Sequence, residues 1–238
     1  MRLALSLALA LLPAPSAAQK IVAAAYVDPT GAYGHGALKD GEYAGLELRY
    51  ADGGGNIFRF DGAVFEDTAP RLHDFDGDGA PEVVAVLSGF EVGAMVMVFG
   101  HDGAAVRPLG QTAAIGERHR WLAIAGIADF DGDGHDEIAY VDRPHLAKTL
   151  RLVRVVLQDG QARFTPVASA TGFSNHRYGA EMIEGGVRAC PGAAPLIVTA
   201  DADWREVEET RLKAGRLVST PVARYEGPES FAPFLACP

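Results

Sequence analysis

His73-Asp-Phe-Asp-Gly-Asp-Gly-Ala-Pro-Glu82 is followed 55 positions later by Ala128-Asp-Phe-Asp-Gly-Asp-Gly-His-Asp-Glu137. Counted from the first Asp, each segment has carboxylates at relative positions 1, 3, 5 and 9. The glycines between them permit a sharply turning backbone, so that alternate side chains can point toward a common centre. The carboxylates are Asp74, Asp76, Asp78 and Glu82 in the first segment and Asp129, Asp131, Asp133 and Glu137 in the second.

The acidic residues of each segment predict a bound cation. Four carboxylates in one short turn repel one another unless a positive charge lies between them. Oxygen-only ligands favour a hard cation, and a flexible loop favours Ca²⁺ over Mg²⁺. We therefore expect two structural Ca²⁺ ions, one for each segment. The alternative, a solvated Asp-Gly turn without an ion, is disfavoured because the same spacing occurs twice.

The segments do not fit an EF-hand, which is another Asp-rich calcium loop. An EF-hand requires a Glu at position 12 of its loop, where the two segments have Ala85 and Tyr140. EF-hand loops also lie between helices. Here residues 82–87 and 137–141 are short apolar runs with β-branched residues, and residues 69–72 and 121–127 lead into the acidic segments. This pattern predicts strand, loop, strand.

The N-terminus predicts export. Residues 1–18 combine Arg2, an apolar stretch over residues 3–12 and small residues before a cleavage point ahead of Gln19, as in a secretory signal peptide. No Cys sits at the cleavage point, so a lipid anchor is not expected, and no later segment is apolar enough to span a bilayer. We expect residues 19–238 to form a single domain, either secreted or periplasmic. The net charge of −10 disfavours nucleic acid as a partner.

Strand and turn signals recur with a similar period. Apolar strands are expected at residues 21–26, 83–87, 138–141 and 196–199. Hairpin turns are expected at Asp52-Gly53, Asp102-Gly103, Asp159-Gly160 and Ala214-Gly215. Four strands in about 55 residues correspond to one blade of a β-propeller. The sequence thus predicts an all-β fold, a small propeller of four blades with four antiparallel strands each. A five-bladed propeller remains an alternative.

The Asp-x-Asp-Gly-Asp-Gly-x-x-Glu loop between two strands resembles the FG-GAP/VCBS repeats of integrin α-subunit propellers and of many exported bacterial proteins. The resemblance covers most of the chain at repeat level, although the metal motif occurs only twice. It implies Ca²⁺ binding by the loop carboxylates, with the backbone carbonyls of Ala80 and His135 as further ligands. The family usually has Asp at position 9, where this chain has Glu in both loops.

The repeat alignment suggests how the propeller would close. Two complete blades are expected near residues 69–116 and 121–170, and a third spans about 178–226. The N-terminal strands within 21–60 lack a leading strand, which residues 231–236 would supply, so that the two ends of the chain would pair in one shared blade. Cys190 and Cys237 fall at metal-loop positions of neighbouring blades that lack the acidic motif. We therefore predict a Cys190–Cys237 disulfide, with two unpaired thiols as the alternative.

The face opposite the metal loops is a candidate ligand surface, because two links between blades there have similar residues. His119, Arg120 and Trp121 are matched 57 positions later by His176, Arg177 and Tyr178. These residues could instead seal one blade against the next, which is the interpretation we favour. The remaining candidates are Asp142, His145, Asp201 and Trp204.

The sequence predicts an exported calcium-binding module whose ligand is a protein, a glycan or a small molecule. The alternative is a hydrolase or lyase that uses Asp142, His145, Arg120 or His176 at the central opening. A third possibility is a purely structural envelope component. No nucleophile elbow, zinc-protease motif, Walker loop or dinucleotide fingerprint is present in the sequence, so we expect binding rather than catalysis.

Overall fold

The computed structural model describes residues 19–237, which form an all-β fold as predicted. All neighbouring strands pair antiparallel, in three sheets. The N-terminal sheet has the path β1-β2-β4-β6-β7-β8, with β3 paired to β2 and β5 paired to β6. Its strands are β1 (Ile21–Pro29), β2 (Glu42–Tyr50), β3 (Gly55–Phe58), β4 (Ala63–Glu66), β5 (Arg71–His73), β6 (Glu82–Gly89), β7 (Gly93–His101) and β8 (Val106–Gln111).

The other two sheets follow in chain order. The second contains β9 (Leu122–Ala128), β10 (Glu137–Asp142), β11 (Thr149–Gln158) and β12 (Gln161–Thr171). The third contains β13 (Phe173–Ser174), β14 (Gly186–Arg188), β15 (Leu196–Asp201), β16 (Glu206–Lys213) and β17 (Arg216–Arg224). A 3-10 turn, η2 (Pro228–Phe231), and one turn of helix, α1 (Ala232–Leu235), follow the last strand.

Three four-stranded units repeat the same path, namely β5–β8, β9–β12 and β14–β17. In each, a loop joins the first two strands and a tight turn joins the last two. The turn between β11 and β12 has φ of 53° at Asp159 and 68° at Gly160, and the turn between β16 and β17 has 48° at Ala214 and 72° at Gly215. Two consecutive positive φ angles suit the twist of a β-hairpin. All four predicted hairpins are present.

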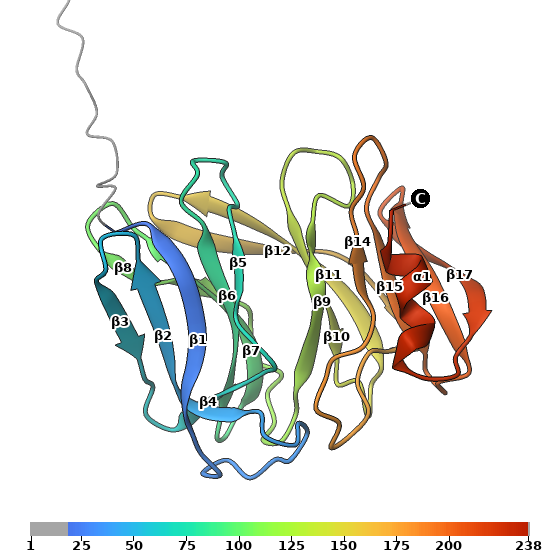
Figure 1. Ribbon diagram of the computed structural model, residues 1–238, viewed down its shortest axis with the longest axis horizontal. Coiled ribbons are helices and arrows are strands. Elements are labelled where there is room, and N and C mark those ends of the chain that lie inside the picture. The colour runs from blue at the N-terminus through green and yellow to red at the C-terminus, as the bar shows by residue number, and fades with distance from the viewer. Residues whose placement is uncertain (1–18, 238) are drawn as a thin grey trace, which may run out of the picture.

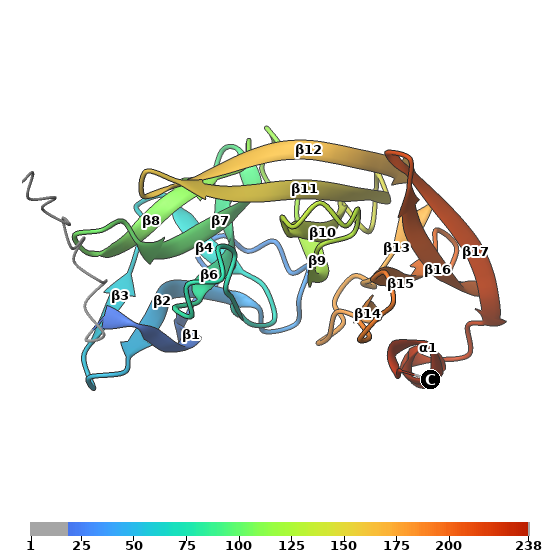
Figure 2. The ribbon, with the colours of Figure 1, turned by 90° about the horizontal axis from the view of Figure 1, so that it is seen from above.

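The sheets lie side by side along an arc and bury apolar residues between them (Figure 2). Strand β6 is buried on both faces because it lies inside this stack. Val84 and Val86 pack with residues of the second sheet, including Ile124 and Ile138. Val83 and the alternate positions that follow it pack with the N-terminal strands. The period of two in a strand therefore places successive residues in two different cores.

The predicted C-terminal strand at residues 231–236 is wrong. This segment is the end of η2 followed by α1, and among residues 19–237 strand β1 pairs only with β2. Pro at the first turns of η2 and α1 favours a helical start. Phe231 and Leu235 are four residues apart, and both pack with the cluster around Leu196 and Val198. The two ends of the described chain lie at opposite ends of the arc, so their strands do not close it (Figure 1).

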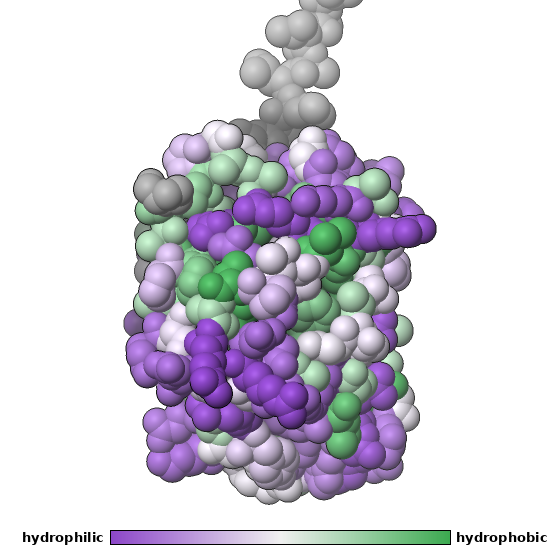
Figure 3. All heavy atoms as spheres, turned by 90° about the vertical axis from the view of Figure 1, so that its right-hand side faces the viewer, coloured by the Kyte–Doolittle hydropathy of each residue, from purple (hydrophilic) through white to green (hydrophobic). Residues whose placement is uncertain are grey.

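The end of the molecule formed by the last sheet is largely hydrophilic (Figure 3). Hydrophobic groups occur there only in small separate areas. On β17, Arg216, Thr220 and Arg224 are exposed. The face therefore lacks the continuous apolar surface by which the sheets pack against one another elsewhere.

Candidate metal centre

Both acidic segments are loops between strands. The first joins β5 to β6 and the second joins β9 to β10. The two loops project from the same edge of the molecule, at the top in Figure 1. No helix flanks either loop, which agrees with the exclusion of an EF-hand from the sequence.

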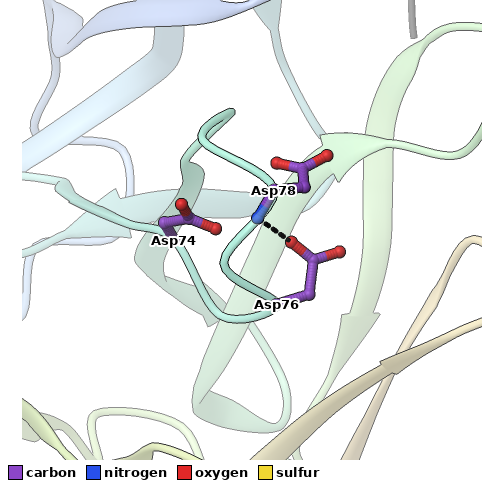
Figure 4. Close-up of side chains that lie close together, drawn as sticks. All are labelled: Asp74, Asp76 and Asp78. Atoms are coloured by element: carbon purple, nitrogen blue, oxygen red, sulfur yellow. Dashed lines mark hydrogen bonds between the residues drawn. The ribbon is translucent and has the colours of Figure 1, made fainter. Parts of the chain in front are cut away.

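The first loop is organised by its own aspartates. Oδ1 of Asp74 accepts a hydrogen bond from the Gly77 amide, and Oδ2 accepts one from the Gly79 amide, each at 2.8 Å. Asp76 accepts from the amide of Asp78 at 3.2 Å (Figure 4). Gly77 and Gly79 have φ of 72° and 83°, a region that glycine reaches without strain. The spacing of Asp and Gly therefore encodes the loop locally.

The first loop has the donor set of a calcium site. Carboxylate oxygens of Asp74, Asp76 and Asp78 all lie within 4.8 Å of one another. Oxygens that bind one Ca²⁺ at about 2.4 Å can be at most about 4.8 Å apart, so the three fit around a single ion. None of the ion pairs among residues 19–237 involves these aspartates. The charge of this loop is therefore not compensated by a neighbouring side chain.

Glu82 lies beneath the first loop rather than among its three aspartates. Its side chain is buried, and Oε2 accepts a hydrogen bond from the amide of Phe75 at 3.1 Å. Burial raises the pKa of Glu82 to about 7, and the neighbouring aspartates add to the rise. The fourth predicted ligand is thus tied to the backbone at the base of the loop.

The second loop repeats the backbone arrangement of the first. Asp129 accepts hydrogen bonds from the amides of Gly132 and Gly134 at 2.7 and 2.9 Å. Glu137 is fully buried and accepts from the amide of Phe130 at 3.0 Å, as Glu82 does from Phe75. Burial raises the pKa of Glu137. The oxygens within 4.8 Å of one another are those of Asp129, Asp131 and Glu137.

Arg154 on β11 distinguishes the second loop from the first. Its Nε donates to Glu137 at 2.9 Å, its Nη1 lies 2.9 Å from Asp133, and its Nη2 donates to Asp131. The pairing of β10 with β11 places Arg154 directly opposite Glu137. Arg154 was not among the predicted site residues, because nothing in the local motif indicates a partner 17 positions away.

In the first loop the strand position that matches Arg154 is a glycine. The register of β6 and β7 pairs Val83 with Phe99, so Gly100 lies opposite Glu82. A Cβ at Gly100 would come within 2.9 Å of Cγ of Glu82. The two loops are linked to each other by His73 and Asp136, whose Nε2 and Oδ2 are 2.7 Å apart.

Comparison with known proteins agrees with this geometry. Residues 74–140 match the family model of the FG-GAP-like repeat. Residues 74–140 therefore carry an FG-GAP-like repeat. The match begins at Asp74, directly after β5, contains β6–β9 and ends at Tyr140 within β10, just beyond the second loop. The resemblance inferred from the acidic motif is confirmed over residues 74–140, and its extension to most of the chain stays a prediction.

Solved structures similar to the chain were also found. The chain aligns with the WD40 domain of SCAP from fission yeast at 10% identity and a TM-score of 0.44, over 86% of this chain and 42% of that one. It aligns with a protein from Lactobacillus plantarum at 11% identity and a TM-score of 0.38, over 76% of this chain and 51% of that one. The chain spans about half, or less, of these two structures. No curated protein matches it.

The third four-stranded unit, β14–β17, has a disulfide at the loop position. Cys190 lies between β14 and β15, the connection that corresponds to the two acidic loops, and is bonded to Cys237 with the Cα atoms 5.7 Å apart. Cys237 directly follows the last turn of helix. The predicted pairing of Cys190 with Cys237 is confirmed, although a helix rather than a strand delivers Cys237.

Several residues of the predicted ligand face lie together in a cluster of histidines and aromatic residues. His119 stacks on His35 with ring centroids 5.2 Å apart, and Nε2 of His145 lies 3.0 Å from Nδ1 of His176. Tyr178, which is 63% exposed, lies between the rings of His35 and His145. His35 was not among the predicted residues, since its segment shows no repeat with the others.

Most of this cluster is engaged in packing. Trp121 is buried, and its Nε1 donates to the backbone oxygen of Glu66 at 2.6 Å. His176 is fully buried, and its Nε2 lies 3.1 Å from the carbonyl oxygen of Ala180. His119 has a φ of 57°, and its amide donates to the Tyr33 hydroxyl at 2.6 Å. These contacts favour the interpretation that the cluster packs one sheet against the next. Tyr178 is the exposed member of the cluster.

The other predicted surface residues lie in separate ion pairs. Arg120 pairs with Glu117, and Arg177 pairs with Glu184 while stacking on Trp204. Asp201 accepts a hydrogen bond from the amide of Arg205 at 2.6 Å and so closes its own turn.

Asp142 is buried beside a cavity of about 870 Å³ between β8 and β10–β12. It pairs there with Arg143 and Arg151. Leu152 and Phe164 form part of the apolar lining. Among residues 19–237, no helix is long and apolar enough to cross a membrane.

Proposed function

We propose that this protein is an exported, calcium-stabilised binding module built as a propeller-like array of blades. The N-terminal strands would serve as the fourth unit beside the three four-stranded ones. One observation carries the proposal: the first acidic loop gathers three carboxylates within reach of a single ion and has no ion pair among residues 19–237. Ca²⁺ suits this set because it prefers several oxygen ligands and tolerates irregular geometry.

The ions would act on stability rather than on chemistry. Each acidic loop connects two neighbouring strands of one sheet, so an ion in it would tie β5 to β6 or β9 to β10. The Asp side chains that would bind the ion also hold the loop backbone through amide hydrogen bonds. Ligand sets of this kind in extracellular modules bind Ca²⁺ with a Kd on the order of 10⁻⁴–10⁻³ M.

Two further features support an exported protein. The predicted signal peptide at residues 1–18 lies outside the residues that the structure describes. The Cys190–Cys237 disulfide is compatible with an oxidising compartment, where such bonds form and persist. Export would also expose the protein to calcium concentrations that match the expected affinity.

The ligand of the module would be a protein, a glycan or a small molecule. The cavity beside Asp142 and the surface around Tyr178 are the two places where binding would be sought first. The cavity has an apolar lining, and Arg143 and Arg151, which both pair with Asp142, also line it. Their remaining N–H groups are hydrogen-bond donors at the wall of the cavity.

Thermal unfolding with and without calcium tests the proposal. With free Ca²⁺ at about 100 times its Kd, one site stabilises the fold by about 2.7 kcal/mol. For a chain of this size that corresponds to a rise in Tm of about 5–10 °C over the same protein in excess EDTA. Elemental analysis of the purified protein should find Ca²⁺. An unchanged Tm in EDTA together with no bound Ca²⁺ would refute the structural ions.

A further inference from the structure

We propose that Arg154 is a built-in counter-ion of the second loop, and that it makes the two acidic loops unequal in their affinity for calcium. The inference rests on the proposed function, since it concerns the same loops. Without Arg154, the two loops would have equivalent carboxylates and equivalent backbone turns.

The guanidinium occupies the carboxylates that an ion would need. It pairs with Asp131, Asp133 and Glu137 through its three nitrogens. Two of these residues, Asp131 and Glu137, also belong to the group of oxygens that could surround a metal ion. The planar fork of Arg suits such multidentate contacts with carboxylates.

Arg154 is held in this position by the sheet. It lies on β11 opposite Glu137 of β10, so the backbone register fixes the start of its side chain beside the loop. Glu137 is fully buried and Arg154 is 23% exposed, which limits screening of their attraction by water. An incoming Ca²⁺ must either displace this guanidinium or bind next to a positive charge.

The first loop lacks a competing cation. Gly100 lies where Arg154 lies in the second loop, and a Cβ there would meet Leu109 and Glu82 below 3.0 Å. None of the ion pairs among residues 19–237 involves Asp74, Asp76, Asp78 or Glu82. Because like charges close together weaken cation binding, we expect the first loop to bind Ca²⁺ at least about tenfold more tightly than the second.

The test is isothermal titration of calcium into three forms of the protein stripped of metal. These are the unmodified protein, Arg154→Gln and Arg151→Gln. Arg151 is the matched control because it lies on the same strand and pairs with Asp142 instead of a loop carboxylate. We expect one tight site and one weaker site in the unmodified protein. Arg154→Gln should tighten the weaker site about tenfold or more, while Arg151→Gln leaves both sites unchanged.

The outcomes separate this inference from the function on which it rests. Two equal sites in the unmodified protein that do not respond to Arg154→Gln would overturn the role of Arg154 and leave calcium binding in place. If neither the unmodified protein nor Arg154→Gln releases heat or binds Ca²⁺, both proposals are overturned.

A second measurement does not depend on the folding of the Arg154 variant. In Asp76→Asn with Arg154 intact, only the weak site should remain. The reciprocal variant Asp131→Asn should keep the tight one. A tight site that survives in Asp76→Asn and is lost in Asp131→Asn would contradict the inference.

Discussion

The β5–β6 loop and the β9–β10 loop have the same carboxylates but different neighbours across the sheet. The first faces Gly100 and has no ion pair among residues 19–237, whereas the second faces Arg154, which contacts three of its carboxylates. A repeated motif therefore does not ensure a repeated site. The backbone turn is encoded within the loop, but the electrostatic environment is supplied by the next strand.

The third unit extends the comparison. Its β14–β15 loop occupies the same position and has no acidic cluster, and Cys190 there is bonded to Cys237. The three corresponding loops therefore differ. Within the described part of the chain, the first has unpaired carboxylates, the second has carboxylates paired with a guanidinium, and the third has a disulfide bond. All three loops lie at the same edge of the molecule (Figure 1).

Removal of the disulfide should have the largest effect on stability. The bond closes a loop with a sequence separation of 47 residues. In the chain-entropy model, a loop of this length contributes about 4 kcal/mol to the free energy of unfolding. We expect Cys190→Ser with Cys237→Ser to lose about that amount in denaturant unfolding. Reductant should destabilise the unmodified protein and leave the double variant unaffected. Equal midpoints for both proteins would show that the third loop does not need its bond.

Arg154→Gln in excess EDTA should have an intermediate effect. The change leaves the buried Glu137 without its charged partner, and loss of a hydrogen bond to a charged group costs about 2 kcal/mol. Calcium should restore much of this loss, because an ion then replaces the guanidinium. Denaturant unfolding with and without Ca²⁺ measures both quantities. A variant as stable as the unmodified protein in EDTA would mean that the two loops are alike after all.

The smallest effect is expected for the histidine cluster on the face opposite the acidic loops, where the stability of the fold should depend on pH. Burial, with His176 and His35 nearby, lowers the pKa of His145 to about 4, and Lys148 contributes in the same direction. In the unfolded chain a His has a pKa of about 6.5. The unfolded state therefore binds more protons between these values, and stability should decline as the pH falls from about 6.5 toward 4.

The variant His145→Gln should flatten that decline in a series of melting curves. His101→Gln is the matched control, because His101 lies on β7 beside Gln19 and outside the histidine cluster. The same slope in all three proteins would show that the cluster does not contribute to the acid sensitivity of the fold.

The interpretation of the sequence was most successful where structure is local. The acidic loops between strands and the Asp-Gly hairpins agree with the structure because a few residues determine each backbone turn. It failed at residues 231–236, where an apolar run after Pro was assigned to a strand. The spacing of Phe231 and Leu235 is compatible with both a strand and a helix, and packing against the third sheet selected the helix.

By itself, the sequence determined the repeated acidic turns, the hairpins and the pairing of the only two cysteines. Each of these depends on residues close together in the chain or on a choice without competitors. Tertiary structure alone placed Arg154 against the second loop, left Gly100 beside the first, and brought His35 to the histidines of later connections between strands. These contacts follow from strand register and from packing between sheets, which couple residues that no local pattern connects.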